Sequence, residues 1–272
     1  MDKVHAGRTA FITGSTSGIG LAIAKSLAVT GARIAVHGLA DQAQIDEVCE
    51  TLKQAGAPEV SFFAGDMRDG DAIAAMMDAV NAWCGDAGGP DILVNNAGMQ
   101  KTAALESVNP DLWNQIIAVN LSGAYHTMLR CVPNMAKRGY GRVINISSVH
   151  GLVASVQKAP YVASKFGLVG LSKVVALEYA NAGSADSGGV TVNCICPGWT
   201  KTGLIEPQVH ARAELFGGDQ VRAIEDLLAE KQPSRRMSSP EDIGELVLFL
   251  TSRAAHNITG AAIPIDGGWT AQ

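Results

Sequence analysis

Four polar residues in the middle of the chain have types and spacing suited to moving a proton. Tyr161 and Lys165 lie four positions apart, which places both side chains on one face of a helix. A tyrosine ionises near about pH 10, and a neighbouring ammonium favours the phenolate, so Tyr161 is a candidate general base. Asn120 lies in a long helical pattern, and Ser148 follows an apolar run. An isolated Tyr-x-x-x-Lys pair is more often a surface pairing, but Ser148 thirteen residues upstream favours the catalytic interpretation.

A glycine-rich turn near the start of the chain predicts a site for a dinucleotide. Residues 13–20 read T-G-S-T-S-G-I-G. Glycines let a backbone turn tightly and approach a pyrophosphate, which then meets the unpaired N–H groups of a helix N-terminus. The spacing is G-x-x-x-G-x-G rather than G-x-G-x-x-G. A tight strand-to-helix turn without a ligand is the alternative interpretation.

The elements that must position these residues alternate along the chain. Apolar runs at 9–13, 33–37, 60–64, 92–95, 142–146, 190–195 and 262–265 predict strands, and helical patterns at 19–30, 42–54, 73–83 and 113–138 lie between the first of them. This alternation predicts one α/β domain over residues 1–272, a doubly wound Rossmann-type parallel sheet with helices on both faces. Ligands bind such sheets at the carboxyl ends of the strands.

Composition limits the classes of partner. The chain has 272 residues, of which 47% are hydrophobic and 17% charged, which is enough for a large core. A net charge of −5 argues against nucleic acid or an anionic membrane as partners. A run of about 18 apolar residues and a secretory signal are both missing. The five cysteines lack metal-ligand spacing, and Cys194 and Cys196 share one strand face, so we expect buried reduced thiols, no metal and a cytoplasmic protein.

Two segments have the character of insertions. Residues 181–189 are small, polar and glycine-rich, which suits an exposed loop. Residues 202–236 form a longer excursion with a helical pattern at 221–230. A long excursion after a strand end is often a substrate lid. A surface insertion without function is the alternative.

The motifs, taken in order, resemble those of the short-chain dehydrogenase/reductase family. They are the glycine turn, Asn95-Asn96-Ala97-Gly98, Asn120, Ser148, Tyr161-Val162-Ala163-Ser164-Lys165 and Pro197-Gly198. The resemblance implies a nicotinamide-dependent oxidoreductase in which Asn120, Ser148, Tyr161 and Lys165 are catalytic. It also implies cofactor contacts from Gly14, Thr16, Ser17, Gly18, Ile19, Gly20, Leu39, Asp66, Met67, Asn96, Ala97, Gly98, Tyr161, Lys165, Pro197, Gly198 and Thr202.

The end of the second strand bears on the choice between NAD and NADP. A carboxylate there would bind the ribose 2′-hydroxyl of NAD, but the sequence reads His37-Gly38-Leu39, and Asp41 is better placed as a helix cap. A 2′-phosphate would need Arg or Lys, which neither the glycine turn nor residues 37–40 supply, and His37 is a weak substitute. We therefore expect NAD.

Within the family, the sequence is similar to the bacterial D-3-hydroxybutyrate dehydrogenases. Matching strings lie at 96–100, 148–155, 196–199, 230–234 and 266–271. The similarity implies NAD-dependent interconversion of (R)-3-hydroxybutyrate and acetoacetate by a homotetramer, for which the apolar helix at 243–250 and the C-terminal strand are candidate interfaces. The substrate is a small 3-hydroxy acid, and its site would comprise Gln100, Ser148, His150, Lys158, Tyr161, Trp199, Gln208 and Trp269.

The chemistry of a short hydroxy acid agrees with that set. Its carboxylate needs polar partners once it is desolvated, and Gln100, His150, Lys158 and Gln208 could supply them. Trp199 and Trp269 would bound the methyl end. Each of these residues also has an alternative interpretation when it is considered alone. Lys158 could be a solvated surface lysine, His150 a loop histidine whose hydrogen bonds are satisfied locally, and the two tryptophans simple core packing.

Two other functions stay open. Another member of the family, acting on 3-oxoacyl thioesters or sugar alcohols, would not need the His150 and Lys158 pair and would more often use NADP. A non-catalytic regulator that senses nicotinamide belongs to a different class. The intact set of Asn120, Ser148, Tyr161 and Lys165 argues against it.

Overall fold

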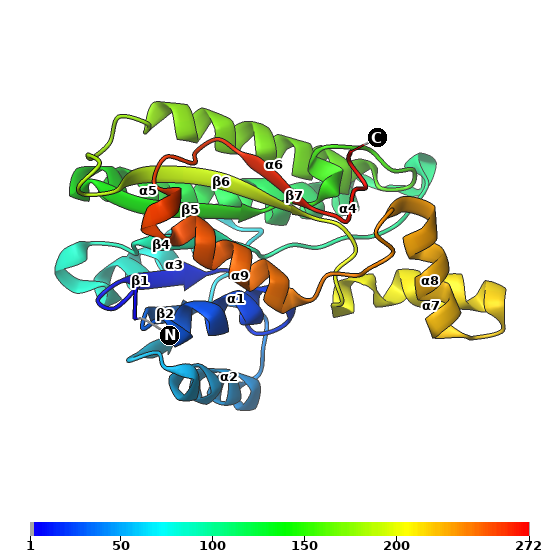
Figure 1. Cartoon of the computed structure of the whole chain (residues 1–272), viewed down its shortest axis with the longest axis horizontal. Helices are drawn as coiled ribbons and strands as arrows, with labels where there is room; N and C mark the ends of the chain where they lie inside the picture. The colour runs from blue at the N-terminus through cyan, green and yellow to red at the C-terminus, as the bar shows by residue number, and fades with distance from the viewer. Residues whose placement is uncertain (1–2, 272) are drawn as a thin grey trace.

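A seven-stranded parallel sheet organises the chain, and the computed structural model describes residues 3–271 (Figure 1). The strand order is β3-β2-β1-β4-β5-β6-β7. The strands are β1 (Thr9–Ile12), β2 (Arg33–Val36), β3 (Val60–Phe62), β4 (Ile92–Asn95), β5 (Tyr140–Ile146), β6 (Gly189–Pro197) and β7 (Ala262–Ile265). The order reverses between β1 and β4, and ligands bind at such a switch point. The predicted doubly wound fold is confirmed.

Helices cover both faces of the sheet because successive strand residues point to opposite sides. In β1, Ala10 and Ile12 pack into one core with α1 (Gly18–Val29), α2 (Gln42–Ala55) and α9 (Pro240–Thr251). Phe11 packs into the other core, with α3 (Gly70–Trp83), α5 (Gly123–Arg138) and α6 (Ala159–Glu178). Figure 1 shows α6 and α9 on opposite sides of β6 and β7. The buried Ile243, Val247 and Leu250 of α9 face the protein's own core, as packing alone requires.

Polar caps fix where several helices begin. The Asp41 carboxylate accepts a hydrogen bond from the Gln44 amide at 2.9 Å, which confirms its predicted capping role at α2. Asp69 caps α3, so this helix begins at Gly70 rather than at the predicted residue 73. Ser239 and Asp242 form a capping box at the start of α9.

The helix predicted over 113–138 is in fact interrupted. It comprises α4 (Pro110–Ile117), a π-helical turn (Ala118–Ser122) and α5. Asn109 caps α4 by accepting the Leu112 amide at 2.8 Å, which explains the earlier start. The wider π turn carries Asn120, and such turns are frequent at functional sites.

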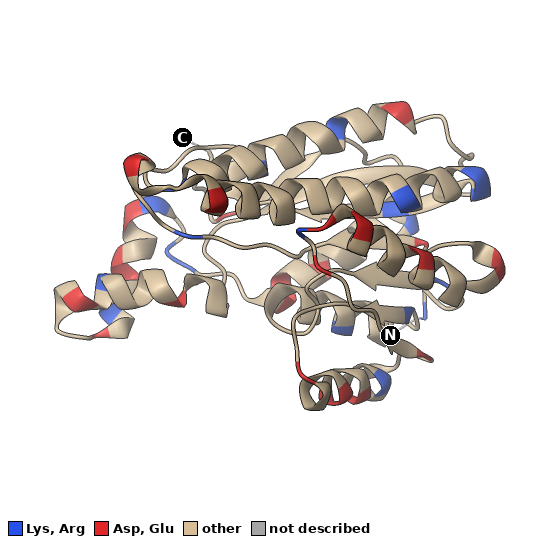
Figure 2. Cartoon of the chain, turned by 180° about the vertical axis from the view of Figure 1, so that it is seen from behind, with Lys and Arg blue, Asp and Glu red and all other residues tan. Residues whose placement is uncertain are grey.

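Residues 202–236 form a small helical unit beyond the sheet (Figure 1). It contains the predicted α8 (Gln220–Lys231) and also α7 (Glu206–Ala213), which the sequence analysis missed. Val209, Ala213 and Leu227 pack in an apolar cluster that also includes Trp199, with Trp269 packed against it. Basic and acidic residues are interspersed in this unit (Figure 2), and Arg212 of α7 pairs with Asp226 and Glu230 of α8.

The structure also bears on the predictions about the cysteines, the loop at 181–189, metal ions and membrane-spanning helices. The five cysteines carry free thiols, and Cys194 and Cys196 are fully buried in β6 as expected. Residues 181–189 form a largely exposed loop. Between residues 3 and 271, no group of three or more His, Cys, Asp or Glu side chains is placed to hold a metal ion. In the same part of the chain, every helix is too short or too polar to cross a membrane.

Candidate active site

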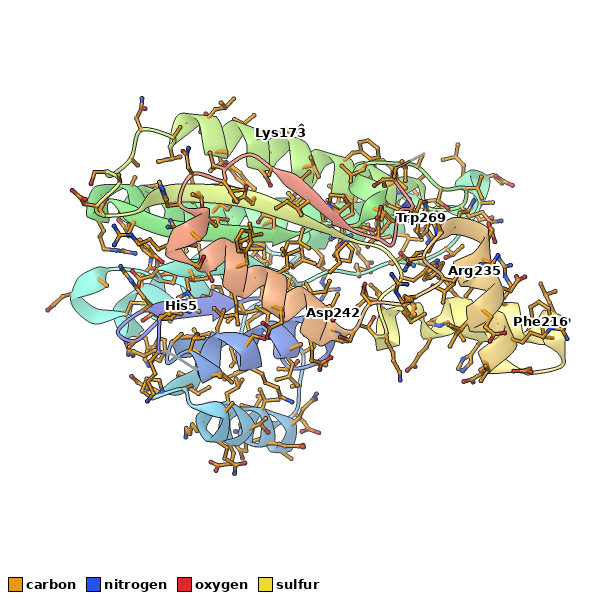
Figure 3. All side chains as sticks on the ribbon, in the orientation of Figure 1. His5, Lys173, Phe216, Arg235, Asp242 and Trp269 are labelled. Carbon is orange, nitrogen blue, oxygen red and sulfur yellow. The ribbon has the colours of Figure 1, made fainter. Side chains whose placement is uncertain are left out.

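A cleft opens between the carboxyl ends of the strands and the helical unit at 202–236. Its empty volume is about 770 Å³. All eight residues predicted to contact substrate line it, together with seven others predicted to contact cofactor: Ile19, Asn96, Gly98, Lys165, Pro197, Gly198 and Thr202. Ile146, Ser147, Val149, Thr200, Leu204 and Ile205 also line it and were not predicted. Figure 3 shows Trp269 between the sheet and the base of α8.

The glycine turn has the shape that a pyrophosphate cradle requires. Gly14 and Gly18 adopt φ angles of +63° and +54°, which disfavour side chains. A Cβ on Gly20 would lie 2.2 Å from the Gly14 carbonyl oxygen. The Asn96 Nδ2 donates to the carbonyls of Thr13 at 3.0 Å and Gly14 at 2.9 Å, and so holds the turn against β4. The three glycines and Asn96 are therefore all found at the glycine turn, as predicted.

Thr13 supports the same turn and was not predicted. Its Oγ1 accepts hydrogen bonds from the backbone amides of Asn96 and Ala97, both at 3.0 Å. The first and fourth strands are thereby locked together at the switch point. A threonine directly after a strand carries no distinctive sequence signal, so only the pairing of β1 with β4 identifies this role.

His37 faces inward, which corrects the suggestion that it could substitute for a phosphate-binding cation. Its Nδ1 accepts from the Gly14 amide at 3.1 Å, so its Nε2 carries the proton and donates to the Gly65 carbonyl at 2.9 Å. Burial lowers the pKa of His37. The His37 ring is therefore neutral and supports the glycine turn through its hydrogen bond with the Gly14 amide. Leu39, by contrast, is 93% exposed.

Asp66 and Met67, both predicted to contact the cofactor, present different groups to it. The exposed carboxylate of Asp66 pairs with Arg68 at 2.6 Å, and hydrogen bonds from Arg68 lower the pKa of Asp66 to about 2. The side chain of Met67 is buried in the core against Gly123. Only the backbone of Met67 is therefore left to contact a ligand.

Tyr161 and Lys165 lie on one face of α6 and are both buried. The Lys165 Nζ donates to the Ile146 carbonyl at 2.8 Å and lies 5.6 Å from the centre of the Tyr161 ring. Burial lowers the pKa of Lys165 to about 8. The expectation that Lys165 lowers the pKa of Tyr161 is wrong for the ligand-free protein, because burial raises this pKa and only a hydrogen bond with Ser148 opposes the rise.

Ser148 and Asn120 complete the predicted catalytic group. The Ser148 Oγ accepts the His150 amide at 3.2 Å, which leaves its hydroxyl proton for an oxygen in the cleft. The Asn120 Oδ1 accepts the Met99 amide at 2.8 Å, and its Nδ2 donates to the Met99 carbonyl and to the Ser164 Oγ at 3.0 and 3.1 Å. Ser164 was not predicted, although it lies inside the Tyr-x-x-x-Lys string.

Lys158 and Gln208 meet at one wall of the cleft. The Lys158 Nζ donates to the Gln208 Oε1 at 2.9 Å, which joins the N-terminus of α6 to α7. Lys158 is only 8% exposed, and burial lowers its pKa to about 8. The surface-lysine alternative is therefore wrong, and Gln208 points to the place that the resemblance implied.

His150 lies beside Lys158 and is 3% exposed. Its Nδ1 is 3.2 Å from the Val153 carbonyl, and its ring packs edge-on against Tyr161 and Trp269 with centroid distances of 6.1 and 5.5 Å. Burial, assisted by the charge of Lys158, lowers the pKa of His150 to about 4. The cleft therefore places a titratable ring against the tyrosine that would handle the substrate proton.

Trp199 and Trp269 line the cleft beside His150 and Lys158, with ring centroids 6.0 Å apart and the Lys158 Nζ 5.7 Å from the centre of the Trp199 ring. The buried side chain of Gln232 accepts the Trp199 amide at 3.1 Å. The Asp266 carboxylate accepts the amides of Gly268 at 3.0 Å and Thr270 at 2.8 Å, which fixes the turn that carries Trp269. Neither Gln232 nor Asp266 was predicted to have this positioning role.

Comparisons with known proteins agree with this geometry. Residues 8–213 match the family model described as short chain dehydrogenase. The chain is 47% identical over 267 residues to the D-beta-hydroxybutyrate dehydrogenase of Cupriavidus necator (98% of this chain, 99% of that protein), and 44% identical over 265 residues to the enzyme of the same name from Rhizobium meliloti (97% and 99%). The crystal structure of L-sorbose reductase from Gluconobacter frateurii, complexed with NADPH and L-sorbose, superposes with a TM-score of 0.90 at 29% identity over the full length of both chains.

Proposed function

The chain belongs to the short-chain dehydrogenase/reductase family, and we propose that it interconverts (R)-3-hydroxybutyrate and acetoacetate with NAD. The observation that carries the proposal is the polar wall formed by Gln100, His150, Lys158 and Gln208 in the cleft that also contains Tyr161. The enzymes of this name in Cupriavidus necator and Rhizobium meliloti support the assignment over nearly the full length of the chain.

The polar wall suits a carboxylate. A buried ammonium whose partner in the ligand-free cleft is a neutral amide oxygen leaves a positive charge without a counterion, and a bound carboxylate would neutralise it. The paired tryptophans lie beside that wall, next to Lys158 and His150, and limit the space there, which suits a methyl group rather than a long acyl chain. A small 3-hydroxy acid satisfies both conditions.

The glycine turn and its surroundings fit a nicotinamide dinucleotide. The contacts would come from the turn at 14–20, from 96–98 and from Thr202, whose methyl group lies 3.7 Å from the Cβ position of Gly18. Residues 37–52 contain neither Lys nor Arg, which favours NAD over a cofactor with a 2′-phosphate. A bound NAD would supply the acceptor for the hydride from C3 of the substrate.

The hydrogen bonds of the four residues support the catalytic roles that we propose. We assign Tyr161 as the base that takes the substrate hydroxyl proton in oxidation and as the acid that returns it in reduction. The Ser148 hydroxyl donates to the reacting oxygen and counteracts the effect of burial on the pKa of Tyr161. Lys165 would hold the ribose, and Asn120, fixed by Met99 and Ser164, would order a water molecule next to it.

The helical unit at 202–236 would act as a lid. Its ends are joined where the Lys201 amide donates to the Ser238 carbonyl at 3.0 Å, next to the bridge between Thr200 and Ser238. The unit can therefore move as one body about this base. The Lys158–Gln208 hydrogen bond is one of its contacts with the wall of the cleft, and the packing of Val209 and Leu227 with Trp199 is another. Closure would exclude water from the reacting atoms.

The assembly and the location are further parts of the proposal. Tyr125 and Leu129 of α5 and Phe166 and Val174 of α6 are exposed apolar side chains, which suits a homotetramer. Light scattering on the purified protein tests this. The free thiols suit a cytoplasmic location.

A rate comparison tests the proposed substrate. The purified protein, supplied with NAD, is given (R)-3-hydroxybutyrate or gluconate, and the reverse reaction is run with NADH and either acetoacetate or an acetoacetyl thioester. We expect the hydroxybutyrate–acetoacetate pair to be turned over at least about a hundredfold more efficiently, because the other compounds lack a carboxylate at the right distance or exceed the space that the tryptophans leave in the cleft. Faster reduction of the thioester would reject the assignment in favour of a 3-oxoacyl reductase.

A further inference from the structure

The two ring nitrogens of His150 have different surroundings. Nδ1 lies 3.2 Å from the carbonyl oxygen of Val153, and a carbonyl can only accept a hydrogen bond, so Nδ1 carries a proton. Nε2 has no hydrogen-bond partner among residues 3–271, and the ring lines the cleft. In the neutral ring, the lone pair of Nε2 therefore faces the cleft.

A lone pair is the wrong group to meet a carboxylate. Carboxylate oxygens accept hydrogen bonds and do not donate them, so a neutral ring with its proton on Nδ1 would repel the substrate. Moving that proton to Nε2 would instead turn a lone pair toward the Val153 carbonyl. Only the imidazolium, with protons on both nitrogens, satisfies the carbonyl and the carboxylate together.

The charges around the ring keep it neutral until an anion arrives. Lys158 and Tyr161 face it from α6, and Lys231, which is paired with Glu230, acts on it from α8. The C-terminal turn contributes Trp269, and α7 contributes Gln208 behind Lys158, and neither titrates. Burial and these cations lower the pKa of His150 to about 4, and no acidic side chain of residues 3–271 opposes them. The ring is thus uncharged near neutral pH in the ligand-free cleft.

We infer that binding of the substrate carboxylate is coupled to uptake of one proton from solvent by His150, so that the anion is held between an imidazolium and the ammonium of Lys158. The inference rests on the proposed function, because it takes the polar wall as the carboxylate site. His150 is then a substrate-binding residue whose charge state is set by the ligand. Binding weakens as the proton concentration falls, although the substrate itself does not titrate in this range.

Calorimetry measures the proton directly. The protein saturated with NAD is titrated at pH 7.0 with butyrate, which has the carboxylate but no hydroxyl to react. The titration is repeated in phosphate, imidazole and Tris, which have different enthalpies of ionisation. The slope of the observed enthalpy against the ionisation enthalpy gives the number of protons taken up. We expect between about 0.5 and 1 proton per site, of which Lys158, with a pKa of about 8, accounts for about 0.1.

Two variants identify the residue that takes up the proton. His150→Gln keeps an N–H donor for the carboxylate but cannot titrate, so proton uptake by this variant should fall to about 0.1 per site. His210→Gln removes an exposed histidine on α7 and should keep the wild-type value. An unchanged slope in His150→Gln, a slope near zero in the wild type, or no butyrate heat in any buffer would overturn the inference.

A kinetic measurement separates this inference from the proposed function. The ratio of kcat/KM for (R)-3-hydroxybutyrate between the wild type and His150→Gln should fall by up to about tenfold per pH unit from pH 6 to pH 8, because only the wild type must bind the extra proton. If the enzyme turns over (R)-3-hydroxybutyrate, but the kcat/KM ratio is independent of pH and the calorimetric slope is near zero, the proton coupling is rejected and the proposed substrate is retained. Butyrate-linked proton uptake without turnover would reject the substrate and keep the coupled carboxylate site.

Discussion

Replacing the buried ammonium of Lys158 should weaken substrate binding selectively. Lys158→Met keeps the length and the apolar stem of the side chain but removes the charge. A hydrogen bond to a charged group contributes about 1.5–3 kcal/mol, and Lys158 lies at the upper end of this range because it is only 8% exposed. A loss of about 2–3 kcal/mol corresponds to a rise in KM for (R)-3-hydroxybutyrate of about 30- to 150-fold.

The split between KM and kcat is part of this prediction. Lys158 holds the carboxylate equally in the ground state and the transition state, so kcat should change by less than about threefold. The assay is the initial rate of NADH formation with (R)-3-hydroxybutyrate and with its uncharged amide. For the amide, the variant's KM should stay within about threefold of the wild-type value.

Lys173 provides a matched control on the same helix. It is exposed on α6, away from the cleft (Figure 3), so Lys173→Met should leave both substrates unaffected. Equal losses on the acid and the amide in Lys158→Met, or a KM for the acid within threefold of wild type, would refute the carboxylate wall.

Further predictions address the base, the cradle, the cofactor and stability. Tyr161→Phe should lower kcat by at least about a thousandfold while NADH fluorescence titrations show unchanged binding, and retained turnover would remove its role. Gly20→Ala should weaken NADH binding at least tenfold, because its Cβ would lie 2.2 Å from the Gly14 carbonyl, and unaltered binding would count against the cradle. Leu39→Arg should raise the ratio of kcat/KM with NADP to that with NAD by at least about tenfold, and a constant ratio would show that the end of β2 does not select the cofactor. The pKa of Lys158 is about 8 in the folded protein and 10.5 ordinarily, so the unfolded chain binds more protons between these values and wild-type stability rises with pH there. Lys158→Met should therefore have the higher Tm at pH 7, with a gap that narrows toward pH 10.5 in thermal melts, and a gap independent of pH would contradict the burial of a charged lysine.

Local patterns were sufficient to predict most of the fold. The apolar runs at 92–95 and 262–265 became β4 and β7 with the predicted bounds. For β4 the reason is that strands buried in a parallel sheet are apolar along their length. The motif residues Gly14, Asn96 and Tyr161 follow or flank such elements, so their gathering at one end of the sheet follows from the topology.

Features that depend on tertiary contacts could not be predicted in the same way. Helix α7 has a weak apolar pattern, and it is stabilised by packing on α8 and by the ion pairs of Arg212. The π turn at Asn120 has no propensity signal, because it is fixed by bonds to Met99 and Ser164. The inward orientation of His37 depends on Gly14 and Gly65, which lie on other elements. The pKa of Tyr161 is raised because burial, which spacing does not reveal, outweighs the effect expected from Lys165.

The central claim is tested most directly by NADH or NADPH absorbance with the purified protein. Each enantiomer of 3-hydroxybutyrate is supplied in turn with NAD and with NADP. We expect rapid formation of NADH with the R enantiomer, and rates at least about a hundredfold lower with the S enantiomer or with NADP. No signal in any of the four combinations, from protein that binds NADH and melts cooperatively, would contradict the proposed function and assign the cleft to a different substrate of this family.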